Sequence, residues 1–238
     1  MNEFEIFEKY LSTPRIGRYM LAKNLDKELC VNLYKSNLNI CKSFHPIIGV
    51  FEVVLRNEID KIFSNYFNDE DWIINQQTSF MIDPSLSYIY NQTGKIVNNR
   101  FILNSVKTVT EKLNKKGIKI TSNKVLSEQS LSFWTEMFEK NYYKVLKGKP
   151  IQIFKFLPSK VNRVEVLNIL NQIRKFRNRI NHNEPICFYK NTVNLQLPLH
   201  IYESIIQLLN WINPETHILL YDIDEVYLSI NLAKNELS

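Results

Sequence analysis

The stretch that decides the fold runs from Val161 to Asn181 and reads VNRVEVLNILNQIRKFRNRIN. Its apolar residues recur at steps of three and four, the period of one face of an α-helix: Val166, Ile169, Ile173, Phe176 and Ile180. Polar and basic residues fill the other positions, so one face of this helix is expected to meet a core and the other to meet solvent. The pair Glu184-Pro185 ends the segment, because a residue before proline avoids the helical region.

The same period recurs along the chain and predicts a series of amphipathic helices. The expected helices cover about 3–11, 26–34, 46–67, 102–113, 127–146, 161–181 and 198–212. Only 5 glycines and 8 prolines are present, fewer than all-β folds usually need for their turns, so an all-α bundle is favoured. Residues 68–94 read as irregular. Residues 188–195 and 218–228 fit either a strand or a helix, which leaves one short β-hairpin open. No repeat or linker is visible, so a single domain over residues 1–238 is expected.

Composition indicates a soluble protein of the cytoplasm. Hydrophobic residues make up 45% and charged residues 23%, as is usual for globular domains. Apolar runs such as 47–51 are too short to span a bilayer, and residues 1–5 lack the basic start and apolar core of a signal peptide, so no membrane partner is expected. The three cysteines (Cys30, Cys41 and Cys187) have no paired spacing, so a disulfide framework or a zinc site is not expected.

Basic residues concentrate in one segment. From Lys140 to His182 there are eleven Lys or Arg residues and one acid, Glu165, which gives this segment a charge of +10 against +6 for the whole chain. A polyanion such as RNA is a natural partner, because each phosphate contact releases a condensed counterion. A solvated basic face that only maintains solubility is the alternative reading.

The strongest chemical signal lies at the end of the 161–181 helix. Asn178 and His182 are four residues apart and share a face that points away from the apolar stripe, and Arg177 lies at one flank of that stripe. Phosphodiester cleavage needs a group that transfers protons near neutral pH and fixed positive charge for the phosphate oxygens. On spacing alone, surface ion pairing with a helix cap explains these residues better than catalysis does.

A family resemblance adds to this reading. The run from Arg177 to His182 resembles the R-x4-H motif of HEPN ribonucleases, and IRKFRNRINHNEPI at 173–186 resembles the Abi-like (abortive infection) signature, usually close to LRxLRNRIAHHEPI. FEVVLRNEI at 51–59 resembles that family's EVxLRNAI helix, and residues 15–34 and 132–138 resemble its first segment and its SFGFWVxLF helix. The match covers about residues 11–190, with 191–238 as a helical C-terminal extension. Asn181 and Asn183 depart from the usual alanine and histidine.

The resemblance implies an all-helical HEPN fold and a metal-independent RNA endonuclease that acts in phage defence or as a toxin. It also implies a homodimer in which two motifs form one composite site, and an RNA or protein antitoxin as a further partner. Under it His182 is the acid/base, Arg177 stabilises transition-state charge, and Asn178 orients the histidine or binds phosphate. The residues expected to bind RNA or to support the site are Arg174, Arg179, Asn181, Glu52, Arg56, Asn57, Lys144 and Lys147.

Alternatives remain for part of this set and for the function. Glu52 and Arg56 are four apart, so an ordinary helical ion pair explains them as well as support of the motif helix does. His45, His200 and His217 stand alone in sequence and are expected to be structural. No phosphate loop and no carboxylate cluster for Mg²⁺ is visible, so no cofactor is expected. The rival function is a non-catalytic HEPN module that binds RNA or a protein; a DNA-binding regulator ranks last because no helix-turn-helix pair is evident.

Overall fold

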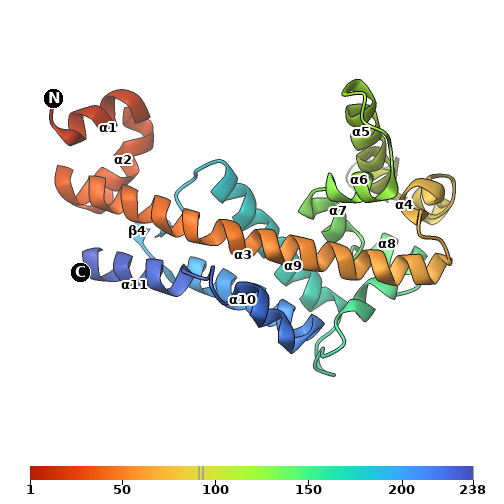
Figure 1. The fold of residues 1–238 in the computed structure, drawn as a ribbon. Coiled ribbons are helices and arrows are strands. Elements are labelled where there is room, and N and C mark those ends of the chain that lie inside the picture. Colours follow the sequence, from red (N-terminus) through yellow and green to blue (C-terminus); the bar gives the residue numbers. More distant parts are fainter. Residues whose placement is uncertain (91, 93, 238) are drawn as a thin grey trace. The chain divides into compact units, whose positions relative to one another are not determined.

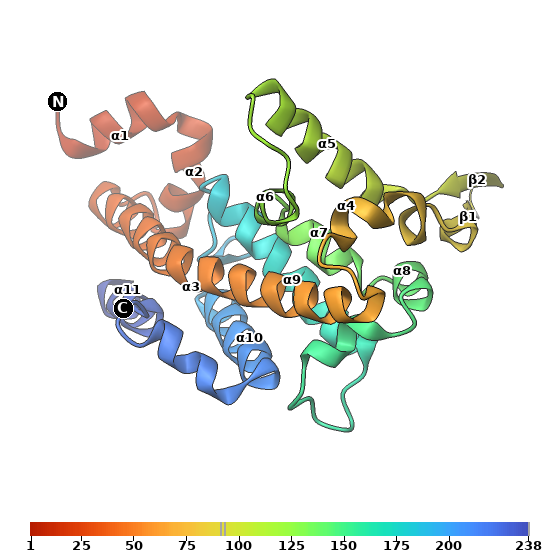
Figure 2. The ribbon, with the colours of Figure 1, turned by 45° about the vertical axis from the view of Figure 1, so that its right-hand side comes forward.

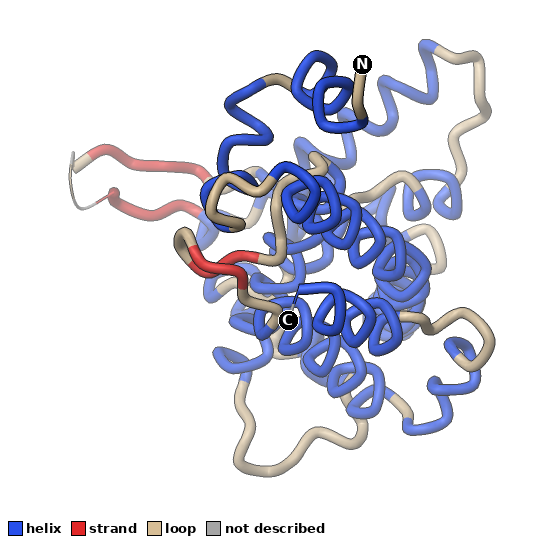
Figure 3. The backbone as a smooth tube through the Cα atoms, turned by 90° about the vertical axis from the view of Figure 1, so that its left-hand side faces the viewer, coloured by secondary structure: helices blue, strands red, loops and turns tan. Residues whose placement is uncertain are grey.

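A computed structural model describes residues 1–90, 92 and 94–237 of the chain. Helices dominate the structure (Figure 1) and make up 71% of it. Within the described residues its strands form two short antiparallel hairpins. The predicted all-α class is therefore confirmed. Where the sequence left one short hairpin open, the structure has two, coloured red in Figure 3.

By their internal contacts the residues form two compact units. Unit 1 comprises residues 1–51, 172–210 and 214–238, and unit 2 comprises residues 52–171 and 211–213. The elements that lie wholly or largely in unit 1 are α1 (Glu3–Leu11), α2 (Thr13–Ala22), β3 (Phe188–Tyr189), β4 (Thr192–Val193), α10 (Gln196–Ile212), the 3₁₀ helix η5 (Pro214–Leu220) and α11 (Val226–Leu237). Two long helices, α3 (Lys27–Phe67) and α9 (Arg163–Asn181), have residues in both units.

Unit 2 contains the end of α3, the start of α9 and the shorter elements that lie between these two helices in sequence. They are α4 (Trp72–Asn75), the 3₁₀ helices η1 (Gln76–Thr78), η2 (Phe80–Ile82) and η3 (Pro84–Leu86), β1 (Ser87–Tyr90), β2 (Lys95–Asn98), α5 (Phe101–Lys115), α6 (Ser122–Ser127), α7 (Leu131–Glu136), α8 (Lys140–Val145) and the 3₁₀ helix η4 (Lys149–Ile153). β1 and β2 pair in antiparallel register, with Ser87 opposite Asn98 (Figure 2). The sequence had indicated irregular structure through residue 94, so this hairpin was missed.

α3 is one continuous helix where the sequence predicted two. Pro46 lies inside it, although an interior proline removes one helical hydrogen bond and costs about 3 kcal/mol. Buried side chains on both sides of Pro46 offset that cost, since Phe44, Ile47 and Phe51 are fully buried and face one core. By length and mean hydropathy alone α3 could also cross a membrane. That match is weak support, because the core helix of a soluble protein passes the same test.

The region predicted as one helix over 127–146 contains two short helices, α7 and α8, and α6 ends at Ser127, where the predicted helix begins. The backbone is extended at Ser130 (φ −81°, ψ 163°) and at Glu139 (φ −64°, ψ 148°), and each extended residue interrupts the helix. Trp134, Phe138 and Tyr142 recur at four-residue steps through this region and are nevertheless all buried. Gly148 ends this region in the left-handed conformation at φ 75°, which glycine adopts without a steric penalty.

Candidate functional site

The end of α9 presents its polar face as its periodicity predicts. Ile173, Phe176 and Ile180 are buried, whereas Asn178 and His182 are exposed. Arg174 and Arg177 lie between these faces and are half-buried, and Asn181 is exposed. The proposed acid/base and its neighbouring amide therefore face solvent, and the Arg177 guanidinium comes from the border of the core.

α9 closes in a hydrogen-bonded turn directly after His182. Asn183 has φ 50°, in the left-handed region that asparagine tolerates better than most residues. Its N–H donates to the carbonyl oxygen of Ile180 (2.9 Å), and the N–H of Glu184 donates to the carbonyl oxygen of Arg179 (2.8 Å). This pair of bonds is a Schellman motif, with Pro185 just beyond it. It explains physically why asparagine suits position 183, where the Abi-like pattern usually has histidine.

Arginine side chains brace the chain after this turn. Arg15, on α2, donates a hydrogen bond to the carbonyl oxygen of Asn183. Arg18, one turn along α2, donates to the carbonyl oxygen of Lys190 and places its guanidinium over the ring of Phe188, 4.5 Å from the centroid. Arginine donors near a helix C-terminus satisfy carbonyl groups that the helix leaves unpaired. The segment after His182 is therefore tied to α2 at both of its ends.

Arg179 also serves this turn. Its guanidinium donates to the carbonyl oxygen of Pro185, and its Nε lies 3.4 Å from the carboxylate of Glu184. Arg179 was expected either to bind RNA or to support the site. Because its guanidinium already has backbone and carboxylate partners, a supporting role fits Arg179 better.

A buried asparagine holds the same segment from α3. The Oδ1 of Asn37 accepts the N–H of Ile186 (2.8 Å), and its Nδ2 donates to the Sγ of Cys41 (3.9 Å). Burial raises the pKa of Cys41 to about 11 and that of the adjoining Cys187 to about 12, so both thiols are protonated at neutral pH. The two cysteines belong to the core around Asn37 rather than to a reactive site.

Asn178 and His182 are available to a ligand. Within the described part of the chain, the side chains of Asn178, Asn181 and His182 form no hydrogen bond or ion pair, although the backbone N–H of His182 donates to the carbonyl oxygen of Asn178 (3.1 Å). An exposed imidazole without a protein partner can approach a substrate directly. The expected orientation of His182 by the Asn178 side chain would thus have to arise with substrate bound.

The basic segment 140–182 is divided between the two units. Lys144 and Lys147 are exposed and belong to unit 2, whereas Arg174, Arg177 and the exposed Lys175 belong to unit 1. Some members are engaged elsewhere: Arg163 donates to the carbonyl oxygen of Phe138 (2.7 Å), and Lys155 pairs with Glu58 at 3.6 Å. RNA binding by Lys144 and Lys147 therefore stays a prediction.

The group Glu52, Arg56 and Asn57 lies in unit 2 on α3. The Nε of Arg56 donates to the Oδ1 of Asn57 (3.3 Å). One turn further, Asp60 accepts the indole N–H of Trp72 (2.7 Å); burial raises the pKa of Asp60, and Trp72 and Arg56 act against that rise. Arg56 thus takes part in a local polar network on α3, and support of the motif helix by this group stays a prediction.

The side-chain contacts of His200 and His217 are with residues outside the R-x4-H motif. The Nε2 of His200 is 3.1 Å from the Oε1 of Gln172, which joins α10 to α9, and the Nδ1 of His217 is 2.8 Å from the carbonyl oxygen of Pro214. His45 is exposed on α3. In the residues that the structure describes, no three His, Cys, Asp or Glu side chains gather in a way that could hold a metal ion.

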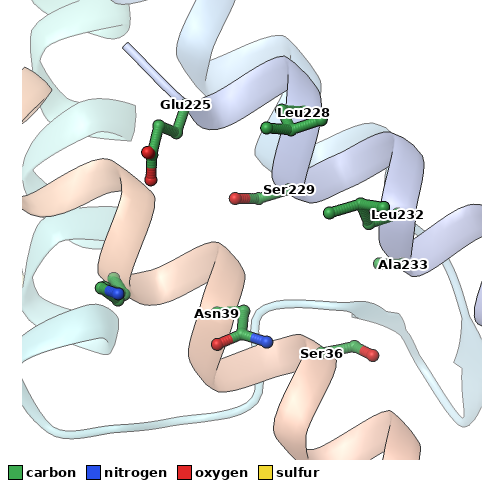
Figure 4. A pocket seen from close by; sticks show the side chains of 8 residues that line it. Ser36, Asn39, Glu225, Leu228, Ser229, Leu232 and Ala233 are labelled. Atoms are coloured by element: carbon green, nitrogen blue, oxygen red, sulfur yellow. The ribbon is translucent and has the colours of Figure 1, made fainter. Parts of the chain in front are cut away.

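A pocket of about 170 Å³ lies elsewhere in unit 1, where α11 runs beside α3 (Figure 4). Its lining residues are Ser36, Asn39, Lys42, Glu225, Leu228, Ser229, Leu232 and Ala233. None of the residues expected in the site lines it.

Sequence reasoning did not assign Arg15, Arg18 or Asn37 to the site. Their contacts join positions 149 to 172 residues apart, so no local pattern exposes them. The available signal was the resemblance of residues 15–34 to the first segment of the Abi-like family, which contains Arg15. Comparisons with models of protein families, with curated proteins and with solved structures find no match to this chain.

Proposed function

We propose that this protein is a metal-independent RNA endonuclease that uses Arg177 and His182 of an R-x4-H motif. One observation carries the proposal: at the end of α9 the His182 side chain is exposed and has no partner among the described residues, with Asn178 on the same face and the Arg177 guanidinium at the border of the core. An imidazole together with fixed positive charge is the combination that phosphodiester cleavage requires.

The reaction begins with attack of a ribose 2′-oxygen on the adjacent phosphorus. A base removes the proton of the 2′-hydroxyl, the bond from phosphorus to the 5′-oxygen breaks, and an acid protonates that oxygen. The products are a 2′,3′-cyclic phosphate and a 5′-hydroxyl. Arg177 stabilises the charge that develops on the phosphate oxygens. Because the attacking group is the 2′-hydroxyl, RNA and not DNA is the substrate.

The reaction needs an acid and a base at once, whereas each motif supplies one histidine. A two-fold dimer brings the same patch of both copies together and thus provides a second His182. The exposed position of His182 on each chain is compatible with such a shared site. We therefore propose that the active species is a homodimer with its two α9 ends near the two-fold axis.

The cellular role rests on the Abi-like resemblance. Under it the enzyme works in the cytoplasm in phage defence or as a toxin, and an RNA or protein antitoxin restrains it. The sequence signature at 173–186 supports this role.

The test is incubation of the purified protein with total cellular RNA, with and without EDTA, beside a His182→Ala variant. The proposal expects cleavage by the wild type that survives EDTA and is lost in the variant. RNA binding without cleavage would instead indicate the non-catalytic module, and cleavage that EDTA abolishes would contradict metal independence.

A further inference from the structure

The segment that follows His182 is held by side chains from the beginning of the chain. Arg15 and Arg18 on α2 donate to the carbonyl oxygens of Asn183 and Lys190, and Asn37 on α3 accepts the N–H of Ile186. All of these residues belong to unit 1. Each bond ends on the backbone of residues 183–190, so together they fix the path of the chain as it leaves the motif helix.

Asn37 is unusual for its place in α3. It is fully buried and lies on the same face as Leu33, Ile40 and Phe44, which are also fully buried. A buried amide is costly unless its hydrogen bonds are made, and a leucine of similar size would suit this apolar stripe. Both ends of the Asn37 amide are used, on Ile186 and on Cys41. The hydrogen bond with Ile186 explains why a polar residue occupies position 37.

The backbone matters here because the His182 side chain has no partner of its own within the described residues. Its place is set by the last turn of α9 and by the Schellman bonds through Asn183 and Glu184. Arg15 bonds to Asn183 itself, the residue next to His182. A change in the path of residues 183–186 would therefore move the imidazole.

We propose that Asn37 and Arg15 are positioning residues that hold His182 in its reactive place through the backbone of residues 183–186. The inference rests on the proposed function. Neither side chain needs to touch RNA. Asn37 and Arg15 therefore affect the rate of the chemical step, which depends on the position of the imidazole, and do not affect the affinity for RNA.

The first test compares Asn37→Leu with Asn39→Leu, an exposed asparagine two residues away on α3. Asn37→Leu should lower kcat by about 10- to 100-fold with KM unchanged, because small displacements of a reacting group are costly in rate. Amide hydrogen exchange of residues 183–190 should rise in the same variant. Asn39→Leu should match the wild type in both measurements. Wild-type kcat in Asn37→Leu would overturn the role of Asn37.

The second test uses Arg15, which is only partly buried and can be replaced without a core defect. Arg15→Met should lower kcat at constant KM, and Arg15→Lys should recover part of the loss because it restores a donor. Lys9→Met on α1 is the charge-matched control. A raised KM with unchanged kcat in Arg15→Met would mean that Arg15 binds RNA, and would contradict positioning.

These tests distinguish failure of the proposed RNA endonuclease function from failure of the positioning role of Asn37 and Arg15. If the wild type does not cleave RNA, the proposed function fails, and hydrogen exchange of residues 183–190 still reports whether Asn37 and Arg15 hold the segment. If the wild type cleaves and both variants keep its kcat, only the positioning inference fails. Should Asn37→Leu not fold, the Arg15 pair decides the question.

Discussion

The ring of Phe176 on α9 packs edge-to-face against the ring of Phe44 on α3, with the centroids 4.8 Å apart and the planes at 64°. Both rings are buried. This contact sets the rotation of α9 about its axis, because Arg177, next in sequence, then falls at the border of the core, and Asn178 and His182 fall outside it. The orientation of the candidate site is thus a consequence of how Phe176 is buried.

Removing this anchor should destabilise the protein strongly. Phe176→Ala deletes a buried ring and leaves a cavity, for which about 3–5 kcal/mol of unfolding free energy is typical. The measurement is chemical denaturation of Phe176→Ala beside Lys175→Ala, whose exposed side chain should change stability by no more than about 0.5 kcal/mol. Equal stability of the two variants would show that Phe176 does not anchor α9.

The cysteines should be inert in the folded protein. Burial raises the pKa of Cys30 and Cys41 to about 11 and that of Cys187 to about 12, from an ordinary value of 9.0. At pH 8 iodoacetamide should therefore modify none of them in the native protein and all three in urea, as mass spectrometry can count.

The raised thiol pKa values also predict how the free energy of unfolding changes with pH. The protonated thiols are favoured in the fold, so their contribution is complete below pH 9.0 and is lost as the pH rises toward about 12. Unfolding free energy measured at rising pH should fall in this range, and replacement of Cys187 by serine should reduce that dependence. Rapid alkylation of native Cys187 would contradict its burial.

RNA affinity should fall steeply with salt. If Lys144 and Lys147 contact phosphates, log K against log[salt] should be linear, and each replacement by alanine should reduce the slope by about 1. Fluorescence anisotropy with a labelled single-stranded RNA measures both effects, with Lys9→Ala on α1 as the control. A salt-independent affinity would exclude these lysines as the binding surface.

The active protein should be a dimer with a shared site. A dimer of one wild-type chain and one His182→Ala chain holds a single His182, which cannot serve as acid and base at once. Adding excess His182→Ala protein to the wild type should therefore lower the cleavage rate per wild-type chain, and sedimentation should show a dimer. A strictly monomeric species that cleaves RNA would contradict the composite site.

Periodicity predicted the long amphipathic helices well, because α5, α9 and α10 each bury one clear stripe. It failed where tertiary packing outweighs a local signal, as at Pro46, whose neighbours are buried strongly enough for α3 to continue. The sequence predicted no helix over 13–22, but α2 forms there with Pro14 in its first turn, where its missing N–H does no harm.

Part of the candidate site was also predictable from helical periodicity. The exposure of Asn178 and His182 follows from the stripe of α9, since both lie opposite Phe176. The contacts of Arg15 and Asn37 with residues 183–186 do not follow from any local pattern, since they span 168 and 149 residues and exist only in the folded chain.

The most direct test of the central claim is single-turnover cleavage of a defined RNA by His182→Ala, paired with thermal melting. His182 is exposed and its removal leaves no core cavity, so stability should change by no more than about 0.5 kcal/mol. Loss of a general acid/base should lower the rate by about 10²–10⁴. A variant that cleaves at the wild-type rate, or one that melts far below the wild type, would contradict the assignment of His182.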